Sequence, residues 1–180
     1  MTITVHTIGH STRSLDELVA ILHHYGIATL ADVRTIPRSR HVPQFNVDHL
    51  AQALPGAGIA YRHLEQLGGR RHAARDTINT GWRNAGFRGY ADHMQSGEFA
   101  AGLATLIELA QQASVAIMCA EAVPWRCHRS MIGDALLVHG IAVVDIFDLA
   151  KARPEQLTSF ARVDGTTITY PADDLLKEDR

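Results

Sequence analysis

The chain has 180 residues, of which 46% are hydrophobic and 20% are charged, and its formal net charge is −2 at pH 7. Such a chain can fold as one domain with a full core, and its balanced charge excludes a general attraction to nucleic acids or to membrane surfaces. No apolar run approaches the roughly 18 residues of a membrane span, and the first residues lack the pattern of an export signal. We therefore expect a cytoplasmic protein with reduced thiols and no membrane partner.

Strands and helices are expected to alternate along most of the chain. Apolar, β-branched runs predict strands at residues 3–8, 29–33, 59–64, 115–119 and 141–146. Capped stretches with apolar residues at helical spacing predict helices at residues 15–25, 46–54, 99–112 and 127–139. Because a helix joins the first two strands, the sheet is expected to be mainly parallel.

Residues 66–94 lack such periodicity and are rich in glycine and arginine, so they predict a long loop. Two roles for this loop stay open. It can form a lid over the sheet edge, or it can form a nucleic-acid surface, since basic groups among aromatic rings suit phosphate tracking and base stacking. Its arginines are Arg70, Arg71, Arg75, Arg83 and Arg88, and its large aromatic residues are Trp82, Phe87 and Tyr90.

The tail predicts a β-hairpin at residues 158–171, because Asp164-Gly165 is a turn signal between β-rich flanks. The predicted fold class is therefore α/β. We expect residues 1–180 to form a single three-layer domain with a mainly parallel sheet and a C-terminal β-hairpin.

The densest group of reactive residues lies between the strand at 115–119 and the helix that follows it. The carboxyl ends of parallel strands meet at one edge of a sheet, which gathers polar groups from distant parts of the chain. Arginines and a helix N-terminus at such an edge favour an anionic ligand. The expected substrate- or anion-binding residues are Ser11, Asp32, Arg34, Ser39, Arg126, His128 and Arg129.

Three residues are candidates for catalysis. Glu121 and His10 can act as general acid or base, and Cys127 can act as a nucleophile, because a helix N-terminus beside His128 and Arg129 lowers the pKa of a thiol. Structural roles compete with these assignments. Both cysteines can be buried core residues, and Glu121 can form a salt bridge with an arginine.

Other charged groups at this edge also have two interpretations. Asp32 and Arg34 can contact a ligand, or they can pair with each other and hold the loop. The spacing from Cys119 to Arg126 is one residue longer than that of the phosphatase signature, which disfavours a phosphatase. Cys119, Cys127, His128 and His10 have the right chemistry for zinc but lack a short paired-cysteine spacing. No metal and no cofactor are therefore expected.

Several of these motifs occur together in one family, and the chain resembles the bacterial domain-of-unknown-function family 488 from end to end. The resemblance implies a small α/β domain, but it names no reaction. It gives His10, Ser11, Asp32, Arg34, Glu121, Cys127, His128 and Arg129 as family motif positions. The segments that carry it are Thr7–Ser11, Asp32–Arg34 with Pro37 and Ser39, Leu67–Gly69, Gly86–Ala91, Met118–Glu121, Cys127–Arg129 and, in the tail, Ala161–Gly165 with Tyr170-Pro171.

These observations favour an enzyme that acts on a phosphate-bearing substrate, a nucleotide or a nucleic acid, by hydrolysis or group transfer. Its expected partner is an anionic small molecule or a nucleic acid. One alternative is a non-catalytic module that binds the same ligands. Another is a thiol redox or metal-binding protein that uses Cys119 and Cys127.

Overall fold

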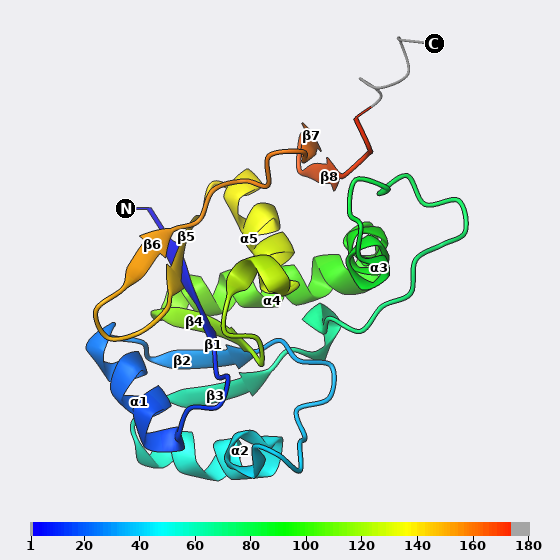
Figure 1. Ribbon diagram of the computed structural model, residues 1–180. Helices are drawn as coiled ribbons and strands as arrows, with labels where there is room; N and C mark the ends of the chain where they lie inside the picture. The colour runs from blue at the N-terminus through cyan, green and yellow to red at the C-terminus, as the bar shows by residue number, and fades with distance from the viewer. Residues whose placement is uncertain (1, 174–180) are drawn as a thin grey trace, which may run out of the picture.

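A six-stranded sheet forms the centre of the computed structural model, which describes residues 2–173 (Figure 1). The strand order is β3-β2-β4-β1-β5-β6, in which the first five strands are parallel and only β6 is antiparallel. This arrangement confirms the predicted α/β class and the mainly parallel sheet. The strands are β1 (Thr4–Gly9), β2 (Thr29–Asp32), β3 (Ala60–His63), β4 (Val115–Cys119), β5 (Ala142–Ile146) and β6 (Ala152–Pro154).

Five helices cover the two faces of the sheet, which gives the three expected layers (Figure 1). Successive side chains of a strand point to opposite faces, so Val5 and Ile8 of β1 belong to two different apolar cores. The core that contains Ile8 packs under α1 and α2, and the core that contains Val5 packs under α3, α4 and α5. The helices are α1 (Leu15–His24), α2 (Val47–Gly56), α3 (Ala85–His93), α4 (Gly97–Gln112) and α5 (Arg129–Val138).

The C-terminal hairpin lies within the predicted residues 158–171. Its strands are β7 (Arg162–Asp164) and β8 (Thr167–Thr169), and Gly165 in the turn has a φ of +62°, a conformation that favours glycine. Tyr170 follows the hairpin and ties it to the domain. Its hydroxyl donates to Asp134 of α5 at 2.7 Å, and its carbonyl accepts from the backbone of Gly81.

The structure corrects two local predictions and adds one strand. The loop prediction for 66–94 is wrong for its last third, because α3 occupies residues 85–93 and is capped by Asn84, whose side chain accepts from the backbone N–H of Phe87. Strand β6 was not expected. The helix predicted from Cys127 begins at Arg129, since residues 124–126 form a 3-10 turn and Cys127 itself is extended.

No helix within residues 2–173 combines the length and the apolar content that a membrane crossing requires.

Candidate active site at the carboxyl edge of the sheet

The register of the parallel strands brings the ends of β1, β2 and β4 together. Gly9 of β1 lies opposite Cys119 of β4, and Asp32 of β2 lies opposite Met118. The chain after β4 then crosses directly over β1. A Cβ at Gly9 would lie 1.7 Å from the carbonyl oxygen of Glu121, so this crossing requires glycine there.

A cavity of about 290 Å³ opens at this edge, beside Cys119. It lies between the turn after β4, the loop after β2 and the start of α3. A cavity of this size accommodates a small ligand or the phosphate end of a larger one. The residues that line it are Arg34, Thr35, Ile36, Gly69, Arg70, Asn84, Gly86, Phe87, Cys119, Ala120, Glu121, Arg126, Cys127 and His128.

Two thiols and one imidazole meet at the base of this cavity. The Nδ1 atom of His128 lies 3.6 Å from the Sγ atom of Cys127 and 3.9 Å from that of Cys119. Their three ligand atoms lie within 4.8 Å of one another, and all three residues are buried. We call Cys119, Cys127 and His128 the thiol–imidazole cluster.

The hydrogen bonds of His128 fix its neutral tautomer. Its Nε2 atom lies 2.8 Å from the carbonyl oxygen of Val33, which can only accept, so Nε2 carries the proton. Nδ1 is then left with a lone pair that faces both sulfur atoms. A proton that leaves Cys119 can move to Nδ1 and produce a thiolate beside an imidazolium, which is how a histidine activates a cysteine.

The two thiols differ in acidity. The pKa of Cys119 is well below its ordinary value, because Cys127 donates a hydrogen bond to its sulfur and because His128 and the backbone of Glu121 also favour the thiolate over the opposing effect of burial. The pKa of Cys127 is well above its ordinary value, because the thiol is buried and lies beside the charge of Cys119. Cys119 is therefore the more acidic thiol, whereas Cys127 was the predicted nucleophile.

Gly69 allows the imidazole to occupy this position. A Cβ at Gly69 would lie 2.4 Å from Nδ1 of His128. We expect Gly69→Ala to displace the ring, to raise the pKa of the Cys119 thiol and so to slow its alkylation by iodoacetamide at the acid end of the pH range. Gly97→Ala is the matched control, because no atom lies within 4 Å of a Cβ there. An unchanged rate in Gly69→Ala would contradict the role given to His128.

A buried ion pair supports the second loop of the site. Arg34 holds both carboxylate oxygens of Asp32, with Nε–Oδ1 at 2.9 Å and Nη2–Oδ2 at 2.6 Å. Tyr61 donates to the same carboxylate, and Arg34 also donates to the carbonyl of Phe45. The guanidinium is thus occupied within the protein, which supports the structural interpretation of this pair.

His10 orients Arg34 and does not line the cavity. Arginine can only donate, so Nε2 of His10 accepts from Nη1 of Arg34 at 3.3 Å, and Nδ1 donates to the carbonyl of Ser11 at 2.9 Å. The ring stacks on Phe45 at 4.4 Å. Burial lowers the pKa of His10, which keeps the imidazole neutral. These contacts give no support to catalysis by His10.

Arg129 is also a structural residue. Its side chain is 1% exposed and donates through Nη1 to the carbonyl of Glu121 at 2.7 Å, which holds the turn after β4. The side chains of Glu121 and Arg126 are exposed and line the cavity. Within residues 2–173, no salt bridge joins Glu121 to an arginine.

Ser11, Asp32 and Ser39 lie outside the cavity lining. Ser11 has a φ of +48° and bonds through its backbone N–H to Ala120. The hydroxyl of Ser39 accepts from the backbone of the turn that follows it. Arg70 lines the cavity although it was assigned only to the long loop. The Gly68-Gly69 pair before Arg70 was the available signal in the sequence, because a Cβ at Gly68 would clash with Thr35 and one at Gly69 would clash with His128.

Comparison with known proteins identifies the family of the chain. No curated protein and no solved structure matches the chain. The family model described as "Domain of unknown function DUF488" matches residues 14–136, which contain Arg34, Gly69 and the whole thiol–imidazole cluster. The chain therefore belongs to the DUF488 family.

Proposed function

We propose that this protein is an enzyme that acts on a phosphate-bearing substrate, a nucleotide or a nucleic acid, by hydrolysis or group transfer with Cys119 as its nucleophile. The observation that carries the proposal is the acidic Cys119 thiol, paired with His128, at the base of a cavity that Arg70 and Arg126 also line. Both arginines are exposed, and no side-chain hydrogen bond or salt bridge within residues 2–173 engages their guanidinium groups. They can therefore hold an anion.

The proposed reaction has two steps. The Cys119 proton moves to Nδ1 of His128, the thiolate attacks phosphorus, and a sulfur–phosphorus bond forms while the bond to the leaving oxygen breaks. The leaving oxygen takes the proton from His128. Water or a second substrate then breaks the sulfur–phosphorus bond, with Glu121 near enough to the cavity to accept its proton. A reduced thiol is required, which agrees with a cytoplasmic location.

Phosphate, nucleotides and short oligonucleotides should raise the melting temperature of the protein. A ligand at about 100 times its dissociation constant stabilises a fold by about 2.7 kcal/mol, which corresponds to about 5–10 °C for a domain of this size. Arg126→Ala and Arg70→Ala should each weaken binding roughly ten- to hundredfold, as expected for the loss of a charged hydrogen bond. Thermal-shift titration measures both effects.

Arg40→Ala is the matched control for these variants. Arg40 is exposed and lies outside the cavity, so its loss should leave the dissociation constants unchanged. A ligand that binds equally well without Arg70 and Arg126 would contradict the proposed anion site. Binding without turnover, unaffected by Cys119→Ser, would instead identify a non-catalytic binding module.

A zinc-binding protein is a second candidate, and the shape of the thiol–imidazole cluster favours it. A tetrahedral zinc ion with ordinary bond lengths places a sulfur and a nitrogen ligand about 3.5 Å apart. The two observed sulfur–nitrogen distances are 3.6 and 3.9 Å. The bond from His128 to the carbonyl of Val33 also matches the way metal-binding histidines are oriented.

Elemental analysis of the purified protein separates the two candidates. One equivalent of zinc, lost in Cys119→Ser and in His128→Ala, would favour the metal protein. In that protein Cys119 should react slowly with iodoacetamide, because zinc-bound thiolates resist alkylation. Metal-free protein whose Cys119 reacts readily with iodoacetamide would favour the thiol enzyme.

A further inference from the structure

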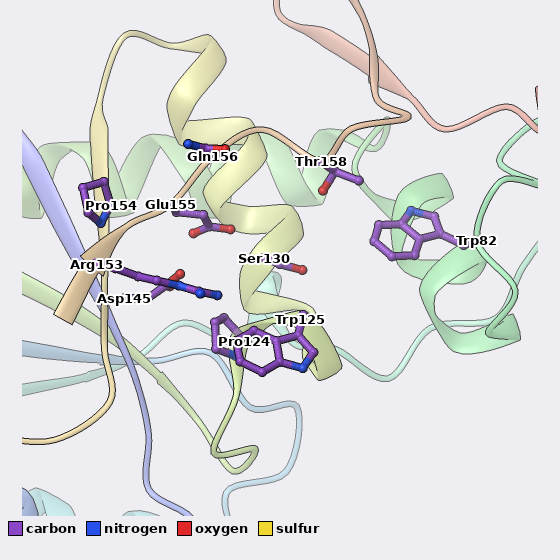
Figure 2. Close-up of a pocket in the computed structure, with 10 residues that line it drawn as sticks. All are labelled: Trp82, Pro124, Trp125, Ser130, Asp145, Arg153, Pro154, Glu155, Gln156 and Thr158. Carbon is purple, nitrogen blue, oxygen red and sulfur yellow. The ribbon is translucent and has the colours of Figure 1, made fainter. Parts of the chain in front are cut away.

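A second and larger cavity, of about 480 Å³, is lined in part by the 3-10 turn at residues 124–126 (Figure 2). Pro124 and Trp125 of this turn line the second cavity, whereas Arg126 and Cys127 line the cavity at Cys119. The two cavities are therefore separate, although neighbouring residues of the same turn line both of them. The remaining lining residues are Trp82, Ser130, Asp145, Arg153, Pro154, Glu155, Gln156 and Thr158.

Two carboxyl groups in this cavity each have one oxygen atom without a hydrogen-bond donor. Asp145 is 2% exposed; its Oδ1 atom accepts from the hydroxyl of Thr7 at 2.6 Å, and no residue within 2–173 donates to its Oδ2 atom. The Oε2 atom of Glu155 is buried without a hydrogen-bond partner. The side chain of Glu155 lies against α5, where a Cβ at Gly133 would come within 2.2 Å of it. A buried acceptor such as Oε2 of Glu155 normally finds a donor.

The nearby arginines do not supply these donors. Within residues 2–173, no salt bridge joins Asp145 or Glu155 to any cation. Arg129 donates through Nη1 to the carbonyl of Glu121, and its buried Nε atom makes no hydrogen bond to either carboxyl group. The guanidinium of Arg153 lies over the rings of Trp125 and Phe147, at 5.0 and 5.2 Å from their centres. Donors for the two carboxyl groups can therefore come from a ligand.

The wall of the cavity indicates the shape of that ligand. Trp125 is 54% exposed, and Arg153 covers part of its ring with a flat group that carries adjacent N–H donors (Figure 2). A flat aromatic wall favours stacking with planar groups, and paired acceptors favour paired N–H donors. A phosphate or carboxylate ligand would meet like charge at Asp145.

We propose that the second cavity binds a small molecule with a planar amidine group, which is a flat group with adjacent N–H donors. Guanidinium and amidinium cations carry this group, and so does a guanine base. The donors reach Asp145 and Glu155 while the flat face stacks on Trp125. This site is separate from the chemistry at Cys119, and it can bind its ligand in a protein with Cys119 replaced.

Calorimetric titration of the full chain with methylguanidine, benzamidine and guanosine tests the proposal. Methylammonium serves as the cation that lacks a planar donor pair. At least one of the three planar compounds should bind, and methylammonium should not. Binding of the two cations alone identifies a guanidinium or amidinium ligand, and binding of guanosine identifies a base; either result supports the site.

Variants of the lining residues show whether a bound compound occupies this cavity. Asp145→Asn should weaken binding at least about tenfold at pH 7, the loss of one charge-assisted hydrogen bond, and Glu155→Gln should have a similar effect above pH 9, where the carboxyl group is charged. Trp125→Ala removes an exposed side chain and tests the stacking without disturbing the buried floor. Glu108→Gln, on the exposed side of α4, should leave the affinity unchanged. Affinity that survives all three lining variants would overturn the proposal, as would equal binding of methylammonium.

The pH dependence of binding gives an independent readout. Burial, together with the charges of Asp145 and Asp134, raises the pKa of Glu155 to about 9, although Arg129 and Arg153 oppose this. Tyr170 also faces this carboxyl group. Glu155 is therefore neutral at pH 7 and becomes charged as the pH rises through 9. Affinity for methylguanidine should increase over this range, and Glu155→Gln should abolish the increase.

Discussion

Serine in place of Cys119 is expected to lower turnover of a phosphate-bearing substrate at least about a thousandfold, because the proposed nucleophile is lost. The same thiol should be the first to react with iodoacetamide. An ordinary thiol slows about tenfold for each pH unit below its pKa of about 8.5, whereas Cys119, with its lowered pKa, should keep its rate down to a lower pH than an ordinary thiol does. Mass spectrometry of the alkylated peptides measures this profile.

Two substitutions at Cys127 serve as the matched pair for this experiment. Cys127→Ser retains a group that can donate to the Cys119 sulfur, and Cys127→Ala does not. The alanine variant should therefore shift the alkylation profile of Cys119 toward higher pH, and the serine variant should shift it less. Faster labelling of Cys127 than of Cys119, with turnover retained in Cys119→Ser, would show that Cys127 and not Cys119 is the nucleophile.

Arg34→Ala is expected to destabilise the fold by about 3–5 kcal/mol, because it leaves the carboxylate of Asp32 buried without its cation. This loss corresponds to a fall of roughly 6–20 °C in the melting temperature. Arg34→Lys should recover only part of the stability, since a lysine cannot form the two parallel bonds that Arg34 makes. Urea denaturation followed by circular dichroism measures the free energies of unfolding of the unmodified protein and of both variants.

The surface pair of Arg38 and Asp48 is the control for this prediction. These side chains lie 3.8 Å apart and are 69% and 85% exposed. Arg38→Ala should therefore change the free energy of unfolding by less than about 1 kcal/mol. Similar losses in Arg34→Ala and Arg38→Ala would show that the buried pair contributes no more than an exposed one.

The elements that the sequence predicted correctly have local signals. The hairpin follows from Asp164-Gly165, and the start of α1 follows from Ser14, whose hydroxyl accepts from the backbone of Glu17. Helix α3 was missed because Gly86 and Gly89 interrupt the pattern. At Gly89 a Cβ would lie 2.6 Å from the carbonyl oxygen of Arg71, so this glycine serves tertiary packing and not the helix itself.

The sequence predicts which residues meet at the carboxyl edge of the sheet, but it does not predict their mutual distances. Parallel strands alone bring Cys119, Arg34 and His128 to one edge, so sequence patterns were sufficient for that. The difference in acidity between the thiols depends on the hydrogen bonds among Cys119, Cys127 and His128, and the orientation of His128 depends on the Val33 carbonyl. No spacing along the chain encodes these contacts. The second cavity was not predicted for the same reason, because its carboxyl groups come from β5 and from the segment after β6.

The strand order has a consequence for the way the chain is made. Strands β1 and β2 are neighbours in sequence, but β4 lies between them in the sheet. Neither strand can pair with β4 until residues 115–119 have left the ribosome, and β1 gains its other neighbour only with residues 142–146. Pairing of such distant segments is slow because a long loop must close first. The first strand to be synthesised is thus among the last to find both of its partners.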